Sequence, residues 1–237
     1  MAGHKFGAAD NAWLTWMMNA GVPQMVADVF RGTRNVVFST ACVYPFVPVD
    51  GPGASESVPA TPPPGDYANS CVGRERMFEY GSRRFGTPGR LVRLSYAIDM
   101  RYGVLHDVAS AVFEGRPLDL TMGHADVIWQ GDANEQALRL LAHCTTPTSP
   151  INVTGPSTPR CDGWPPSSAA ASAASRCSRA RKRRRRRGCS TRAKRSALFG
   201  APRVGIDTMI DWVADWVQRG GASLGKPTHF STRDGKY

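Results

Sequence analysis

Residues 35–44 read Asn35-Val-Val-Phe-Ser-Thr-Ala-Cys-Val-Tyr44, an apolar run that leads into hydroxyl side chains. The β-branched and aromatic residues predict a buried strand over Asn35–Thr40. The stretch from Val47 to Asp66 is rich in Pro, Gly and Ser, which predicts a loop. A helix is expected over residues 67–84, since Gly86 and Pro88 end that run. A strand, a loop and a helix therefore follow one another.

The same alternation continues on both sides of this stretch. Further strands are predicted over residues 91–95, 118–122, 127–129 and 151–154. A helix is predicted over residues 10–31, with Asp10 or Asn11 as cap and a kink at Pro23. Two more are predicted over residues 104–114 and over residues 132–143, the latter with Asp132 as cap. A last helix is predicted from Asp207, with an inward stripe formed by Ile210, Val213, Trp216 and Val217. Strands that alternate with helices favour an α/β domain with a largely parallel sheet.

The composition fits one globular domain with or without a small lobe. The 237 residues include 41% hydrophobic residues and six Trp, enough for a core. No stretch reaches the length of a membrane-spanning helix, and Met1–Phe6 lacks the pattern of a secretory signal, so we expect a cytoplasmic protein. The six Cys show no CxxC pairs and the His residues share no ligand spacing, so we expect reduced thiols and no metal site.

The net charge of +11 is concentrated in one segment. Residues 157–196 hold thirteen Lys and Arg and one acid, whereas the rest of the chain holds seventeen basic and eighteen acidic residues. The segment includes Arg181-Lys-Arg-Arg-Arg-Arg-Arg187 and has few large apolar residues, so it cannot form a core and is expected to be disordered. It is interpreted as out-of-frame translation of a GC-rich gene. A basic arm that binds nucleic acid and an ordinary disordered insertion are the alternatives.

Several motifs in order carry a family resemblance. Phe38-Ser-Thr-Ala-Cys-Val-Tyr44, then Glu56 in the Pro-rich loop, then Tyr67, resembles the S/T-S/T-x-x-V-Y … E … P … Y-x-x-x-K signature of extended short-chain dehydrogenases/reductases, the NAD-dependent epimerase/dehydratase family. Further matches are Asn19, Leu91-Val-Arg-Leu94, Trp129-Gln-Gly-Asp132 and Asp207-Thr-Met-Ile-Asp-Trp-Val213. The resemblance covers about residues 2–156 and 196–237. It implies a Rossmann-type parallel sheet with a small C-terminal α/β substrate lobe.

The resemblance also implies a site and a cofactor. Tyr67 and Thr40 match the residues that exchange a proton with the substrate oxygen, and Asn19 matches the water-relay Asn. The positions on the cofactor side are Gly3, Tyr67, Cys71 and Tyr96. The family uses NAD or NADP on hydroxyl-bearing small molecules, including sugar nucleotides. We therefore expect an oxidoreductase with a small-molecule substrate, a second copy of the chain as a partner, and neither a membrane nor a nucleic acid.

Two departures put activity in doubt. Cys71 stands where the family has Lys, a cation that lowers the pKa of the phenol and binds the nicotinamide ribose. Arg74, seven residues after Tyr67, and Lys5 are the two candidates to replace it. No GxxGxxG or GxGxxG turn occurs to hold the pyrophosphate, and Gly51-Pro-Gly53 lies in a loop of the wrong context.

These departures shape the predicted domain organisation. Residues 1–156 are expected to form an incomplete Rossmann-type sheet, without the first βα units, together with part of the substrate lobe. Residues 157–196 form the basic segment, and residues 197–237 supply the C-terminal helix and tail of the lobe. We expect a truncated, impaired enzyme. A non-catalytic fragment or pseudoenzyme is one alternative, and nucleic-acid binding through the arginine run is the other.

Overall fold

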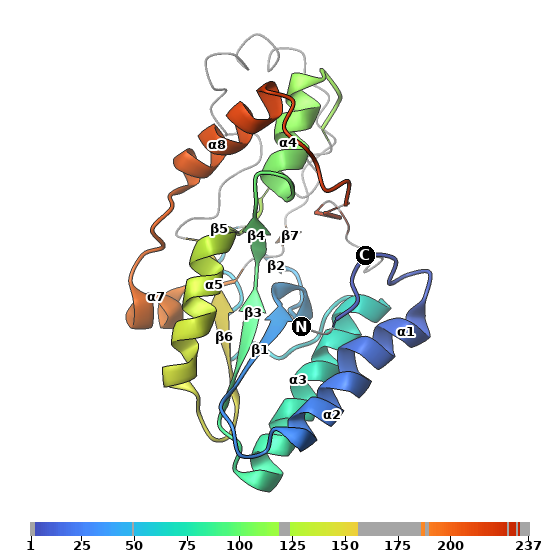
Figure 1. Ribbon diagram of the computed structural model, residues 1–237, viewed down its shortest axis with the longest axis vertical. Helices are drawn as coiled ribbons and strands as arrows, with labels where there is room; N and C mark the ends of the chain where they lie inside the picture. Colours follow the sequence, from blue (N-terminus) through green and yellow to red (C-terminus); the bar gives the residue numbers. More distant parts are fainter. Residues whose placement is uncertain are drawn as a thin grey trace.

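The main sheet is parallel and occupies the lower half of Figure 1. The computed structural model describes residues 3–48, 50–118, 124–155, 186–187, 190–226, 228–230 and 232. Within these ranges the main sheet has three strands in the order β1-β3-β6, and both pairs are parallel. The strands are β1 (Asn35–Thr40), β3 (Gly89–Leu94) and β6 (Ser149–Val153). The α/β fold with a parallel sheet is confirmed.

One face of the sheet is covered by a pair of packed helical segments, on the right in Figure 1. They are formed by α1 (Ala12–Trp16), the π-helical turn η1 (Met17–Gly21), α2 (Val22–Val29) and α3 (Asp66–Phe85). Their shared core joins Ala27 and Phe78 to Val37 and Leu91 of the strands. The apolar spacing of these helices thus buries one side of each strand.

The opposite face is covered by α5 (Gln130–Arg139), the 3₁₀ turn η3 (Leu140–His143) and α7 (Ala193–Phe199). Val92, Ile151 and Val153 of the sheet pack there against Ala133 and Leu140. Leu91 and Val92 therefore point to opposite faces, as period-2 alternation in a strand requires. The same alternation places Arg93 on the α3 side, where the site lies.

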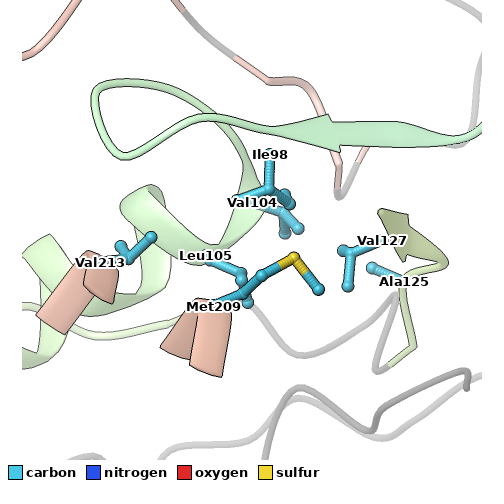
Figure 2. Close-up of a cluster of buried hydrophobic side chains, with 7 residues drawn as sticks. All are labelled: Ile98, Val104, Leu105, Ala125, Val127, Met209 and Val213. Atoms are coloured by element: carbon cyan, nitrogen blue, oxygen red, sulfur yellow. The ribbon is translucent and has the colours of Figure 1, made fainter. Parts of the chain in front are cut away.

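A second core lies beyond the carboxyl ends of the strands. The short parallel strands β4 (Tyr96–Ile98) and β5 (Val127–Trp129) pack with α4 (Val104–Phe113) and α8 (Ile206–Gln218). Figure 2 shows the cluster formed by Ile98, Val104, Leu105, Ala125, Val127, Met209 and Val213. The C-terminal α8 thus returns to cover the α4 lobe (Figure 1).

Most of the basic segment lies outside the described residues. Within its described part, β7 (Arg186–Arg187) pairs antiparallel with β2 (Val47–Pro48). The backbone N–H of Ser190 donates to the Asp126 carboxylate at 2.7 Å, and Ser190 is buried. α7 begins at Ala193, so a helix crosses the predicted boundary at residue 196.

The individual element predictions had mixed outcomes. The strands over 35–40, 91–95, 127–129 and 151–154 and the helices over 67–84 and 104–114 are confirmed to within a few residues. The helix over 10–31 is confirmed as a helical run from Ala12 to Val29, in which the π turn η1 lies between α1 and α2, and Asn11 caps it by accepting the Leu14 N–H. The strand over 118–122 lies almost wholly outside the described residues. Among the residues that the structure describes, no helix combines the length and apolarity needed to cross a bilayer.

Two predicted helix caps were wrong. Asp132 and Asp207 lie in the first turns of α5 and α8, whose caps are Trp129 and Gly205. The Asp132 carboxylate instead accepts the backbone N–H of Val204 at 3.0 Å, so tertiary contact outweighed capping. The inward stripe predicted for α8 is confirmed for Val213, which is buried, and for Ile210 and Val217, which pack against the second core, whereas Trp216 donates its indole N–H to the Ala222 carbonyl.

Candidate active site

The predicted proton-exchange pair meets at the carboxyl edge of the sheet. Thr40 ends β1, and Tyr67 lies in the first turn of α3, which Gly65 precedes with φ 142°. The Thr40 hydroxyl is hydrogen-bonded to the phenol of Tyr67, and it also accepts the Cys42 N–H at 3.2 Å. The carboxyl edge is where open α/β sheets bind ligands. Residues 27 positions apart in sequence therefore form one hydroxyl pair.

Asn19 is fully buried and joins three segments. It lies in the π turn η1, where its side-chain amide donates to the His4 carbonyl at 2.8 Å and to the Ser70 hydroxyl at 3.0 Å. Its amide oxygen accepts the His4 N–H at 2.8 Å. Ser70 in turn donates to the carbonyl of Tyr67 at 2.9 Å. Asn19 thus connects the N-terminal segment to the helical turn that carries the phenol.

Arg74 completes this connection from the next turns of α3. Its guanidinium donates to the amide oxygen of Asn19 at 2.6 Å, to the carbonyl of Asn19 at 3.3 Å and to the carbonyl of Phe38 at 2.7 Å. Gly3 lies against it, since a Cβ at Gly3 would be 3.1 Å from an Arg74 nitrogen. Sequence reasoning named Arg74 as a candidate cation, but no local pattern predicted these contacts.

The environment of the site keeps both the phenol and the thiol protonated. Burial raises the pKa of Tyr67 well above its ordinary value of 10.0, and Cys71 and Cys42 raise it further. The Thr40 hydrogen bond and the charge of Arg74 lower the pKa of Tyr67 in part. Burial likewise raises the pKa of Cys71 to about 11. Tyr67 is therefore an acid at neutral pH, and it becomes a base only with help from nearby charge.

The remaining predicted positions lie at different distances from this pair. Cys71 is buried among Val43, Tyr44 and Ala54 and is hydrogen-bonded to Tyr67. The Lys5 ammonium lies 6.0 Å from the Tyr67 ring centroid and 3.4 Å from the Tyr102 hydroxyl. Tyr96, in contrast, lies in β4 and packs against the second core. The contacts above join Gly3, Asn19, Thr40, Tyr67 and Cys71 directly or through Arg74, and they do not extend to Tyr96.

A buried ion pair joins α3 to the sheet next to these residues. Glu75 of α3 accepts two hydrogen bonds from the Arg93 guanidinium, at 3.0 and 2.6 Å, and one from Ser39 at 2.6 Å. Burial alone would lower the pKa of Arg93, but the Glu75 carboxylate and Tyr44 outweigh it and raise that pKa. Sequence reasoning missed this pair. Its signal was a pair of polar residues, Ser39 and Arg93, at inward positions of apolar strands.

A second buried network fixes the Pro-rich loop. Asn152 of β6 accepts the Tyr44 hydroxyl at 2.7 Å and donates through its amide to the Ala54 carbonyl at 3.0 Å. The backbone N–H of Asn152 donates to Glu56 at 3.0 Å. Glu56, which the sequence motif includes, therefore anchors the loop to the sheet. This contact joins Glu56 to β6 and not to Tyr67.

Comparisons with known proteins place this geometry in a known fold. No family model and no curated protein matches the sequence. The structure is similar to the UDP-glucose 4-epimerase from Thermotoga maritima with UDP-glucose, with a TM-score of 0.72 and 12% identity over 93% of this chain and 76% of that one. It is also similar to the UDP-glucose 4-epimerase from Thermus thermophilus in complex with NAD, with a TM-score of 0.69 and 19% identity over 92% and 75%.

A third similar structure is the UDP-glucuronic acid 4-epimerase from Bacillus cereus with UDP-glucuronic acid and NAD. Its TM-score is 0.71 and its identity 15%, over 92% of this chain and 74% of that one. The chain has the fold of the UDP-sugar epimerases. The predicted resemblance is thus confirmed at the level of the fold. At these identities the epimerase fold establishes an architecture, and the activity has to be argued from the site.

Proposed function

We propose that this chain is an NAD(P)-dependent epimerase/dehydratase-like oxidoreductase of the extended short-chain dehydrogenase/reductase type, impaired as it stands, whose substrate is a hydroxyl-bearing sugar nucleotide. The observation that carries the proposal is the Tyr67–Thr40 hydroxyl pair at the carboxyl edge of an epimerase-like sheet. The similar structures hold UDP-sugars and NAD, which supports this substrate class and cofactor.

In the proposed reaction Tyr67 exchanges one proton with a substrate hydroxyl. The phenol gives its proton to a substrate oxygen, or as phenolate it accepts the proton of a hydroxyl, while Thr40 holds that oxygen in reach. Asn19 fixes the turn of α3 through Ser70, so the phenol is positioned before substrate arrives. When bound, the oxidised cofactor would accept the hydride as the hydroxyl is oxidised, and the reduced cofactor would return a hydride as the carbonyl oxygen takes the proton.

The residues of this chain fit only one end of such a cofactor. Gly3, Tyr67 and Cys71 would face the nicotinamide end, with Gly3 leaving room where a side chain would meet Arg74. The sequence contains no GxxGxxG turn whose N–H groups would cradle the pyrophosphate. We therefore expect NAD(P) to bind weakly, with a dissociation constant on the order of 1 mM.

Measured turnover and binding test this proposal. The purified chain is incubated with NAD and UDP-glucose or UDP-glucuronic acid, and reduced cofactor and sugar products are followed. We expect slow turnover that falls by about 10²-fold or more in Tyr67→Phe, since general acid–base catalysis contributes that much. The matched control is Tyr80→Phe, an exposed tyrosine on the same helix.

Two outcomes would contradict the proposal. If neither a dinucleotide nor a UDP-sugar binds at millimolar concentration, the chain is a non-catalytic fragment. Micromolar NAD binding would instead overturn the claim of impairment.

We further propose a homodimer formed through α1 and α2. These helices and the π turn η1 between them expose large apolar side chains, as interfaces between subunits often do; among them are Trp13, Trp16, Met17, Met25 and Val29. Light scattering is expected to give twice the chain mass, and Val29→Asp is expected to give monomers. Leu138→Asp, at an exposed position on α5, is the control that should remain dimeric. A monomeric wild type would contradict the proposal.

A further inference from the structure

Arg74 is a cation held only by neutral oxygens. Its three hydrogen bonds go to the amide oxygen and carbonyl of Asn19 and to the carbonyl of Phe38. Among the described residues none of its acceptors is a carboxylate. Other arginines in the described part of the chain do form ion pairs, most of them at the surface, as Arg76 does with Glu79. A partly buried guanidinium without an acid therefore leaves its charge available to a nearby anion.

The neighbouring acid is already satisfied. Glu75 follows Arg74 directly, but its carboxylate faces the sheet and is bound by Arg93 and Ser39. The two side chains leave α3 in different directions, as consecutive helical residues must. Glu75 therefore does not neutralise Arg74 by a direct contact.

The helix directs the charge of Arg74 toward the phenol. Tyr67, Cys71 and Arg74 are spaced at i, i+4 and i+7, so they lie along one face of α3. The charge of Arg74 lowers the pKa of both Tyr67 and Cys71, against the effect of burial. The ionisable groups that act on the phenol are Lys5 from the N-terminal segment, Cys42 from the 3₁₀ turn η2 (Ala41–Val43), and Cys71 and Arg74 from α3, while Glu75 acts on Cys71.

The other candidate cation is placed less well. Lys5 lies over the Tyr67 ring at 6.0 Å from its centroid, the outer limit of a cation–π contact. Its ammonium donates to the Tyr102 hydroxyl at 3.4 Å and lies 5.6 Å from the Phe6 ring centroid. Lys5 is thus shared among three aromatic residues, whereas Arg74 is fixed by three hydrogen bonds.

We propose, resting on the proposed function, that Arg74 is the positioning residue that replaces the cation missing at Cys71: its charge stabilises the Tyr67 phenolate, and its hydrogen bonds hold Asn19. Arg74 keeps its own protons throughout, because a guanidinium is not deprotonated in proteins. It therefore acts on Tyr67 by charge and on Asn19 by geometry. Position 74 thus compensates, one helical turn away, for the cysteine at position 71.

Titration of the Tyr67 phenol tests this role without cofactor or substrate. The full chain is labelled with fluorinated tyrosine, whose phenol is more acidic than that of tyrosine. The ¹⁹F signal of Tyr67 is assigned by its loss in Tyr67→Phe. We expect Arg74→Gln, which can still donate to Asn19 but lacks the charge, to raise the titration midpoint by about 1–3 units. Arg74→Lys is expected to stay near wild type.

The control and the rescue decide between charge and packing. Lys5→Met is expected to move the midpoint by less than Arg74→Gln does. Adding Cys71→Lys to Arg74→Gln is expected to lower the titration midpoint again. If Arg74→Gln does not fold, Cys71→Lys alone is made in the wild-type chain, where it is also expected to lower the midpoint. An unchanged midpoint in Arg74→Gln, a larger shift in Lys5→Met, or no lowering by Cys71→Lys would overturn the inference. Failure of the proposed function would appear separately, as absent ligand binding with the midpoint shifts intact.

Discussion

Two consecutive residues of α3, Arg74 and Glu75, carry opposite charges into different surroundings. Glu75 is almost fully buried and meets a buried guanidinium and a hydroxyl, so its charge is neutralised within the fold. Arg74 meets carbonyl and amide oxygens, so its charge is solvated but not neutralised. The comparison separates a charge that holds the structure together from one that acts on a neighbouring phenol. Substitutions at the two positions should therefore affect different measurements.

The largest expected effect is on stability. Glu75→Ala leaves the Arg93 guanidinium buried without its anion, which typically costs about 3–5 kcal/mol. Urea denaturation followed by circular dichroism measures this loss. If Glu75→Ala cost less than about 1 kcal/mol, the buried pair would not support the fold, and the contrast with Arg74 would fail.

The next effect is on catalysis. Cys71→Lys places a second cation one helical turn from Tyr67, which should increase the phenolate fraction at neutral pH by about 10- to 1000-fold. Turnover with NAD and a UDP-sugar is expected to rise accordingly. Cys71→Met, whose side chain is unbranched and about as long as that of lysine but carries no charge, should show no rise in turnover. An equal rise in both variants would assign the effect to packing.

A smaller effect is expected at Asn19, which links Ser70 and Arg74 of α3 to His4 of the N-terminal segment. Asn19→Ala removes one acceptor of Arg74 and both side-chain bonds to His4, which leaves buried polar groups unpaired. Such a loss costs about 1–3 kcal/mol. It should also shift the Tyr67 midpoint, because Arg74 loses a restraint. A stability loss with no midpoint shift would limit Asn19 to a structural role.

The smallest effect is expected at the surface of the same helix. Arg76 and Glu79 form an ion pair whose side chains are 56% and 21% exposed. Glu79→Ala should cost about 1 kcal/mol or less, because water screens such pairs. This variant is the matched control for Glu75→Ala in the same denaturation experiment. A cost equal to that of Glu75→Ala would show that burial does not distinguish the two.

Local patterns predicted the architecture well, because hydrophobic periodicity is read directly from neighbouring residues. The strand Asn35–Thr40 and the helix that follows the Pro-rich loop agree closely with β1 and α3. The short strand β4 was missed, since Tyr96–Ile98 continues directly from β3 with only Ser95 between them. The cap expected at Asp132 was wrong because a tertiary contact outweighed the local preference, and Asp207 lies inside α8, which Gly205 precedes.

The sequence predicted residues that the structure brings together, but not the charged groups around them. The motif named Thr40, Tyr67 and Asn19, and the structure joins the first two directly and the third through Ser70. The contact between Arg74 and Asn19 spans 55 positions, and the Glu75–Arg93 pair spans 18. Such pairings depend on how helices pack on the sheet. A single sequence could flag the buried polar positions but not name their partners.

The pH dependence of turnover tests the central claim most directly. If Tyr67 is the proton-exchanging group, kcat/KM for hydroxyl oxidation should rise about tenfold per pH unit from neutral pH to above about pH 10, because burial raises the pKa of Tyr67 beyond its ordinary value. This rise should disappear in Tyr67→Phe. A flat profile, or the same rising profile in the phenylalanine variant, would contradict the account.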